Sequence, residues 1–183
     1  MAEVAVPEES TTTSLERAAA GDPAAFAELV REHQSLVFGL ALHCLRDRAL
    51  AEELAQDVFL QLFRSLGEIE SPAHLKFWLR RVASHRAIDV ARRRRWWPKL
   101  GLDDIPEPAQ AAAGRDSLLD GHLRKLVATL PEKQRAVVVL RYQEDLDPME
   151  IAAVLEMPVA TVKSYLHRAL AMLRRKLGRE EVQ

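Results

Sequence analysis

The sequence predicts an all-α protein made of two small helical domains joined by a flexible linker. Apolar residues recur at helical spacing along almost the whole chain, and no stretch shows the alternation of apolar and polar residues that is typical of a β-strand. The periodicity is lost once, between Trp97 and Ser117, where proline, glycine and alanine accumulate. A length of 183 residues allows two small domains but excludes a large α/β barrel.

The first domain is predicted to begin with a short helix and a longer one. Thr13 and Glu16 form a capping box for the short helix, and Gly21 can end it. Asp22 and Pro23 provide an N-cap and a first-turn proline for the next helix. The apolar face of that helix contains Phe26, Leu29, Val30, Val37, Leu40, Ala41 and Cys44.

Two further helices complete the first domain, over about residues 49–66 and 73–94, with a break at Gly67 to Pro72. The apolar stripe of the first of these contains Leu54, Ala55, Val58, Phe59, Leu62 and Phe63. In the second, the residues expected to be buried are Phe77, Trp78, Val82 and Ile88, with the arginines outside. The three long helices can share one core.

Helical periodicity resumes in the second domain. An apolar stripe of Leu119, Leu123, Leu126 and Leu130 precedes Pro131, which opens a helix that contains Val137, Val138 and Leu140. Asp147, Pro148 and Glu150 combine an N-cap, a first-turn proline and a capping-box acid for a helix that ends near Leu155. A turn at 156–158 leads to a last helix over about 159–177, whose inward residues are Val162, Leu166, Ala169, Leu170, Leu173 and Leu177. The chain thus divides into a tail with a short helix at 1–23, a first domain at 24–97, a linker at 98–117 and a second domain at 118–180.

Glycine, cysteine and histidine usage excludes several kinds of site. The seven glycines are never closer than seven residues apart, whereas Walker A and dinucleotide-binding loops need glycines within about five residues. The single cysteine, Cys44, excludes an internal disulfide, and its apolar face favours a core residue over a redox sensor. No two histidines have metal-ligand spacing with a carboxylate. We therefore expect no cofactor, no metal site and no catalytic residue.

The chain is expected to be cytoplasmic, without membrane insertion. Residues 1–14 contain three glutamates and no Lys or Arg, which is the wrong charge for a signal peptide. No apolar run reaches membrane-spanning length.

A net charge of −1 hides two strongly basic segments. Residues 76–99 carry a net charge of +8 and residues 163–179 one of +6, whereas residues 1–34 and 103–120 carry −5 and −4. Because phosphates respond to the local potential, this distribution predicts two contacts with a polyanion. For either segment alone, a solvated helix surface is an equal alternative.

The last two predicted helices have the geometry of a helix-turn-helix. In that motif, a short helix, a turn of about three residues and a longer helix place the longer helix in the DNA major groove. The outer face of the last helix carries Thr161, Lys163, Ser164, His167, Arg168, Arg174 and Arg175, opposite its apolar residues. This pattern favours DNA reading over a purely structural helical hairpin.

Two sets of motifs occur in order along the chain, about a linker apart. The first contains Ala51-Glu52-Glu53-Leu54-Ala55-Gln56-Asp57-Val58-Phe59, then Phe77-Trp78-Leu79 through Ala87-Ile88-Asp89 and the arginine run. The second contains Leu130-Pro131-Glu132-Lys133-Gln134-Arg135 through Leu140-Arg141, Glu150-Ile151-Ala152, and Thr161-Val162-Lys163-Ser164 with Arg168-Ala169. These sets resemble regions two and four of bacterial RNA polymerase sigma factors, in the small two-domain extracytoplasmic function (ECF) group. The resemblance covers about residues 24–177.

The resemblance implies a three- to four-helix bundle for region two and a helix-turn-helix for region four. Region four would read the minus-35 promoter element through Thr161, Lys163, Ser164, His167 and Arg168, with Arg174 and Arg175 on phosphates. Region two would open and read the minus-10 element, with a loop at 68–74 that receives an unstacked base. The implied contacts on its promoter helix are His74, Lys76, Arg80, Arg81, His85 and Arg86.

The same resemblance implies three partners: core RNA polymerase, promoter DNA and an anti-sigma factor. The polymerase-binding face would consist of Glu52, Glu53, Gln56, Asp57, Leu60, Gln61 and Arg64, with Gln56 and Asp57 as its main contacts. Without the resemblance, a solvated helix face would be the preferred interpretation of these residues.

Some residues depart from the family pattern. His85 stands where family members often have Asn, Tyr165 where they often have Arg, and Glu156 where the turn often has Gly. Fold and general function are expected to survive these changes, but the promoter sequence does not follow from the family there. For Trp96 and Trp97, packing over the first domain is favoured over stacking on single-stranded DNA.

Two other functions compete with the promoter-recognition subunit. A conventional helix-turn-helix regulator with a dimerising or ligand-sensing N-terminal domain would explain the second domain, but it leaves the motif around Gln56, Asp57 and Phe59 without a purpose. A helical hydrolase or nuclease is disfavoured, since adjacency of Ser84 and His85 does not make a nucleophile and base pair.

Overall fold

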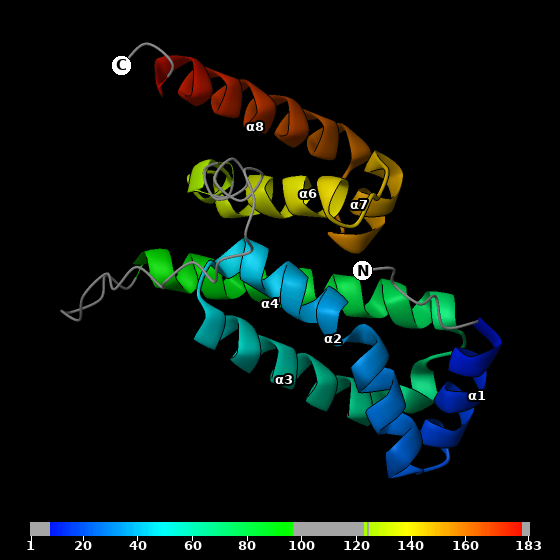
Figure 1. Cartoon of the computed structure of the whole chain (residues 1–183). Helices are drawn as coiled ribbons and strands as arrows, with labels where there is room; N and C mark the ends of the chain where they lie inside the picture. The colour runs from blue at the N-terminus through cyan, green and yellow to red at the C-terminus, as the bar shows by residue number, and fades with distance from the viewer. Residues whose placement is uncertain (1–7, 97–122, 124, 181–183) are drawn as a thin grey trace, which may run out of the picture. The chain divides into compact units, whose positions relative to one another are not determined.

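The computed structural model describes residues 8–96, 123 and 125–180 (Figure 1). The described residues form helices joined by turns, with no β-strand among them, so the predicted all-α class is confirmed. The chain divides into two compact units, residues 1–87 with 154–156 and residues 88–153 with 157–183. The predicted linker at 98–117 and Trp97 lie outside the described residues.

The first helix, α1 (Glu8–Ala19), begins earlier than the sequence predicts. Thr13 lies inside α1, so the predicted capping box of Thr13 and Glu16 is wrong. The inward hydroxyl groups instead bond to α2 (Pro23–Leu45): Thr11 Oγ1 donates to Glu32 Oε1 at 2.8 Å, and Ser14 Oγ donates to Glu28 Oε2 at 2.7 Å. Hydroxyl–carboxylate contacts therefore help to hold α1 on α2.

The junction between α1 and α2 follows the prediction. Gly21 has a φ of +94°, and the Asp22 amide donates to Arg17 O at 3.0 Å while the Gly21 amide donates to Ala18 O at 3.0 Å, which is the Schellman pattern at a helix C-terminus. Asp22 then caps α2, because its Oδ1 accepts from the amide of Ala24 at 2.9 Å. A hydrogen bond from the Arg17 side chain, followed by that amide, lowers the pKa of Asp22.

Helices α2 and α3 (Arg48–Ser65) pack together as the apolar patterns predict. The buried residues of α2 include Leu29, Val37, Leu40, Ala41 and Cys44, and those of α3 include Leu54, Val58, Phe59 and Leu62. Phe63 was expected in the same stripe, and this prediction is wrong: its side chain is 57% exposed and meets the Phe26 ring edge-on at 5.2 Å.

The next helix, α4 (Pro72–Trp96), follows a short 3₁₀ turn, η1 (Leu66–Glu68), and begins within one residue of the predicted position. Its fully buried stripe consists of Leu75, Leu79, Ala83 and Ala87, each with 0% exposure. The residues predicted to be buried, Phe77, Trp78, Val82 and Ile88, are only half-buried, so that prediction is wrong. Small alanines in the stripe allow the backbone of α4 to approach its neighbours closely.

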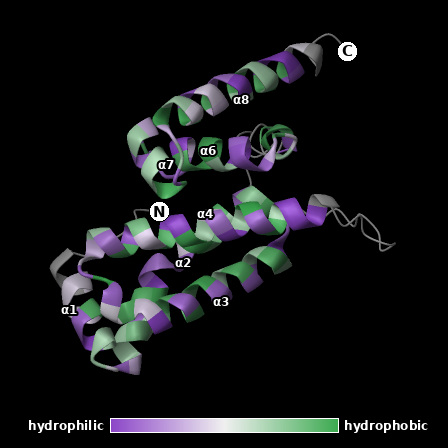
Figure 2. Cartoon of the chain, turned by 180° about the vertical axis from the view of Figure 1, so that it is seen from behind, coloured by the Kyte–Doolittle hydropathy of each residue, from purple (hydrophilic) through white to green (hydrophobic). Residues whose placement is uncertain are grey.

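The C-terminal unit is built around α6 (Glu132–Tyr142) and α8 (Val159–Glu180), which pack together, with α7 (Pro148–Val154) between them in the sequence. Residues 136–140 are all buried, and Leu126, Leu130, Val138, Ala169 and Leu173 form a hydrophobic cluster. Green and purple bands alternate along α8 in Figure 2, as expected for a helix with one buried face. Leu123 and Leu177, which were expected on apolar stripes, are 47% and 39% exposed.

His33 is a buried titratable side chain in the N-terminal unit, with its Nδ1 atom 3.9 Å from Glu32 Oε1. His33 on α2 is 3% exposed, and no hydrogen-bond partner within the described residues reaches its Nε2 atom. Burial lowers the pKa of His33 below its usual value of 6.5; Lys76 acts in the same direction, while Glu32 opposes it. The neutral imidazole is therefore favoured in the folded protein.

This burial predicts a loss of stability in mild acid. Below about pH 6.5 the unfolded chain binds a proton that His33 resists in the fold, so the free energy of unfolding should fall until the pH passes the lowered pKa. Urea unfolding of the full chain from about pH 7.5 to 5 measures this effect, and His33→Gln should flatten the profile. A variant with the wild-type pH profile would assign the effect to another group.

Candidate functional site

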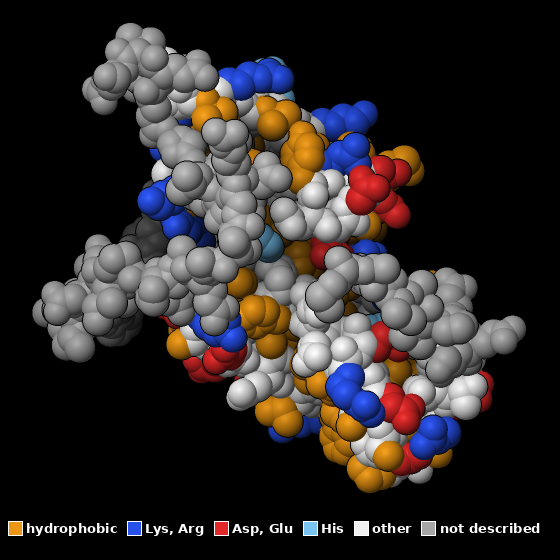
Figure 3. Space-filling view, in the orientation of Figure 1, with side chains coloured by type: hydrophobic (Ala, Val, Ile, Leu, Met, Phe, Trp, Pro, Cys, Tyr) orange, Lys and Arg blue, Asp and Glu red, His pale blue; other side chains and the backbone are white. Residues whose placement is uncertain are grey.

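All seven residues predicted to contact the minus-35 element lie on α8. Lys163, His167, Arg168, Arg174 and Arg175 are exposed, and Thr161 and Ser164 are half-buried. Figure 3 shows Lys and Arg side chains along α8. Arg168 and Arg175 are seven residues apart, so they share a face and lie about 10 Å apart along the axis. The described face is basic and polar, as a nucleic-acid contact requires.

The helix before α8 has the cap that the sequence predicts. Asp147 Oδ1 accepts from the amides of Met149 at 2.7 Å and Glu150 at 2.9 Å, and Glu150 Oε2 accepts from the Asp147 amide at 2.7 Å. These reciprocal bonds form a complete capping box. They fix the start of α7, the first helix of the helix-turn-helix.

The turn between α7 and α8 explains the family's usual glycine. Glu156 has a φ of +50°, in the left-handed region that glycine adopts without strain. The amide of Met157 donates to Ala152 O at 3.1 Å, which closes the C-terminus of α7. The turn therefore keeps a glycine-like conformation with a glutamate in it.

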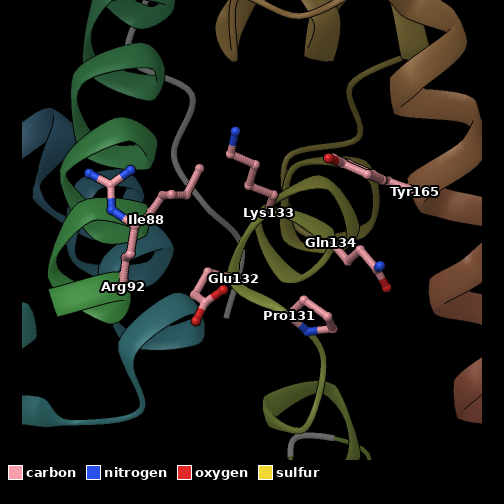
Figure 4. Close-up of a pocket in the computed structure, with 7 residues that line it drawn as sticks. All are labelled: Ile88, Arg92, Pro131, Glu132, Lys133, Gln134 and Tyr165. Carbon is pink, nitrogen blue, oxygen red and sulfur yellow. The ribbon is translucent and has the colours of Figure 1, made fainter. Parts of the chain in front are cut away.

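Tyr165, the second departure from the family pattern, is half-buried. Its side chain extends from α8 toward α6, as Figure 4 shows with the residues of α6 around Gln134. This orientation sets it apart from the exposed basic residues of the same helix.

The predicted minus-10 contacts on α4 do not share one face. At about 100 degrees per residue, His74, Arg81 and His85 lie on the side opposite the buried stripe. Lys76 and Arg80 lie at one edge of that stripe. Arg86 lies at the other edge, where its guanidinium group bonds to α3.

The loop before α4 is shaped by side chains at its two ends. Ile69 is 7% exposed and anchors the loop, while Gly67, Glu68 and Glu70 are exposed. Ser71 Oγ accepts from the amide of His74 at 3.1 Å, and His74 Nδ1 accepts from the amide of Glu70 at 3.3 Å. Since Nδ1 is an acceptor, the neutral His74 ring carries its proton on Nε2.

The residues predicted to bind polymerase form one continuous face of α3. Glu52, Glu53, Gln56, Asp57, Leu60 and Arg64 are exposed and Gln61 is half-buried. Leu60 lies at the centre of this face, with Asp57 and Gln61 at the edge near α4. At the α2 edge, Arg48 pairs with Glu52 at 2.9 Å and lies over the Phe38 ring.

Sequence reasoning missed Phe63 as part of this face. Phe63 lies three residues after Leu60 and seven after Gln56, a spacing that already places it on their side of the helix. Leu60 and Phe63 are each 57% exposed. Two large apolar side chains among charged ones are typical of a protein-binding surface.

Comparison with protein families matches both halves of the chain. Residues 29–97 match the Sigma-70 region 2 model, and residues 121–173 match the Sigma-70, region 4 model. Together with relatives at 30–33% identity over most of their length, these matches decide the family. The chain belongs to the sigma-70 family of RNA polymerase sigma factors. This sigma factor is therefore a transcription initiation factor, and the match to region 2 excludes the conventional helix-turn-helix regulator.

Relatives with curated names place the sigma factor near the ECF group. It is 33% identical over 173 residues to ECF RNA polymerase sigma factor SigE of Mycolicibacterium smegmatis, covering 88% of this chain and 66% of that protein. It is 33% identical over 162 residues to the RNA polymerase sigma-E factor of Streptomyces coelicolor, covering 86% and 88%. It is 30% identical over 171 residues to ECF sigma factor SigK of Mycobacterium sp. strain KMS, covering 90% and 89%.

Two solved structures share the fold of the sigma factor. CnrH, solved in complex with the cytosolic domain of CnrY, aligns with a TM-score of 0.67 and 22% identity over 92% of this chain and 97% of CnrH. RpoE of Bartonella quintana, solved with the anti-sigma factor NepR, aligns with a TM-score of 0.66 and 20% identity over 84% and 96%. Within the described residues, no helix has the length and hydropathy to cross a membrane, and no three metal-ligating side chains cluster.

The capping box of α7 predicts a local effect in the sigma factor. Asp147→Ala should remove two hydrogen bonds and destabilise α7 by about 1 kcal/mol. Hydrogen exchange at the amides of Met149 and Glu150 should become faster, while exchange in α2 stays unchanged. Asp147→Asn keeps the capping oxygen without the charge and should behave nearly as wild type. Equal losses in both variants would show that charge, rather than the cap, stabilises α7.

Proposed function

We propose that this sigma factor binds core RNA polymerase through the exposed face of α3 and directs it to promoters through α4 and α8. The observation that carries the proposal is that three helices, α3, α4 and α8, each present a polar surface opposite their buried residues; on α4 this surface is only partly exposed, since His74 and His85 are half-buried. One surface combines acidic and apolar residues, and the other two are basic. No catalytic step is required of the chain, and the proposed location is the cytoplasm.

On α8, the proposed base readers are Thr161, Ser164 and Arg168. An exposed arginine in the first half of a recognition helix can make a bidentate contact to guanine. Lys163 and His167 flank this stripe. Arg174 and Arg175 lie farther along α8, where a straight helix leaves the groove, so we assign them to phosphates.

On α4, the proposed minus-10 surface is the outward side that carries His74, Arg81 and His85. Lys76 and Arg80 at the edge supply phosphate contacts. The loop at 68–74 is proposed to receive an unstacked base, and unstacking costs a few kcal/mol that a fitted pocket and phosphate contacts offset.

The α3 face is proposed to dock on a coiled coil of the largest catalytic subunit of RNA polymerase. Gln56 and Asp57 are its proposed polar contacts, and Leu60 and Phe63 provide apolar area that water otherwise covers. An anti-sigma factor is the proposed inhibitory partner. The aligned sigma factor RpoE of Bartonella quintana was solved in complex with the anti-sigma factor NepR, which supports this assignment.

The first functional prediction is that Asp57→Arg abolishes binding to core polymerase. Asp57 is exposed and pairs with Arg86 at 2.9 Å, and exposed pairs contribute at most about 1 kcal/mol, so the fold should survive. Asp89→Arg is the matched control, because it makes the same charge change and breaks another exposed pair, with Arg92. Gel filtration with core polymerase measures both variants. Co-elution of Asp57→Arg at wild-type affinity would refute the α3 assignment.

The second prediction separates base readers from phosphate anchors on α8. Arg168→Ala should cost about 1–3 kcal/mol on one promoter and relax the preference at a single minus-35 position. Arg175→Ala should weaken all promoters alike and lower the salt slope by about one. Holoenzyme binding to single-base promoter variants at two salt concentrations measures both effects. Opposite behaviour of the two variants would mean that α8 docks differently.

A further inference from the structure

Arg86 forms a side-chain network that ties α4 to α3. Its Nη1 donates to Asp57 Oδ2 at 2.9 Å, while Nε and Nη2 donate to Gln61 Oε1 at 3.2 and 2.9 Å. Three of the five N–H donors of the guanidinium group are thus used within the N-terminal unit. A planar guanidinium group held by three hydrogen bonds has little freedom to rotate toward another partner.

The rotation of α4 also separates Arg86 from the proposed DNA surface. Arg81 and Arg86 are five residues apart, which corresponds to about 140 degrees around the helix. Arg81 lies opposite the buried stripe, whereas Arg86 lies at its α3 edge. A role for Arg86 at the minus-10 element therefore has no support in the packing.

We propose that Arg86 is a positioning residue of the polymerase-binding face rather than a DNA contact. This inference rests on the proposed function of α3. Arg86 occupies one carboxylate oxygen of Asp57 and the carbonyl oxygen of Gln61. Within the described residues, Asp57 Oδ1 and Gln61 Nε2 have no hydrogen-bond partner.

The network thereby presents a fixed acceptor and a fixed donor side by side on α3. A partner with a cation opposite Asp57 and an acceptor opposite Gln61 would meet both groups already ordered. Ordering such side chains on binding normally weakens association, and preorganisation removes that loss. Arg86 thus improves polymerase affinity without touching the polymerase.

Affinity for core polymerase in the absence of DNA tests this role. Arg86→Ala should weaken binding about tenfold. Arg86→Met should weaken binding to the same extent. Because it keeps the aliphatic stem, it separates loss of the hydrogen bonds from loss of packing. Arg86→Lys should not restore affinity, because one ammonium group cannot reproduce the fork. Arg31→Ala, an exposed arginine on α2, is the control and should bind as wild type.

A double-mutant cycle separates positioning from general stabilisation. In an Asp57→Ala/Gln61→Ala background, Arg86→Ala should cause no further loss of affinity. An equal loss in both backgrounds, or wild-type core affinity combined with failed promoter opening, would overturn the proposal. If Asp57→Arg itself retains core binding, the α3 assignment fails first, which distinguishes failure of the proposed function from failure of the Arg86 role.

Discussion

The buried stripe of α4 is the constraint on which the rest of the N-terminal unit depends. Leu75, Leu79, Ala83 and Ala87 recur every four residues and are fully excluded from solvent. Because they must face the core, the rotation of α4 about its axis is fixed, and every other side chain of the helix follows from it. Arg81 is thereby directed outward. The same rule turns α3 so that its charged face is exposed, and it brings the two helices together where their polar edges meet.

Helix ends and apolar faces could be predicted where one strong local interaction decides them. The cap at Asp22, the helix end at Gly21 and the capping box at Asp147 could be predicted because each is formed by residues close together in the sequence. The start of α1 could not be predicted, because Thr11 and Ser14 donate hydrogen bonds to carboxylates on another helix. Interactions between segments far apart in sequence leave no spacing pattern to detect.

Large aromatic residues account for three of the errors in the predicted core. On α4, Phe77 and Trp78 are the most hydrophobic candidates, yet the alanines take the innermost positions because close helix approach leaves no room for rings. On α3, Phe63 joins the exposed face. Phe63 was assigned to the core because large apolar side chains are usually buried. Its angular position on α3, three residues after Leu60, instead places it on the exposed face. The sequence therefore predicted which residues belong to the candidate site. The structure was needed to show that the basic residues of α4 lie on different faces of that helix.

The net charge of the chain does not explain its basic surfaces, whereas the local distribution of charge does. The chain has a net charge of −1, yet basic residues dominate two helical segments. Charges farther apart than about 8 Å are largely screened at physiological salt, so the acidic segments do not cancel the basic surfaces. Phosphate attraction alone, however, carries no sequence preference. Selectivity must come from the few side chains whose rotation aims them at bases, and that rotation is set by the apolar stripes. In this sigma factor, burial on one side of a helix determines what the other side can recognise.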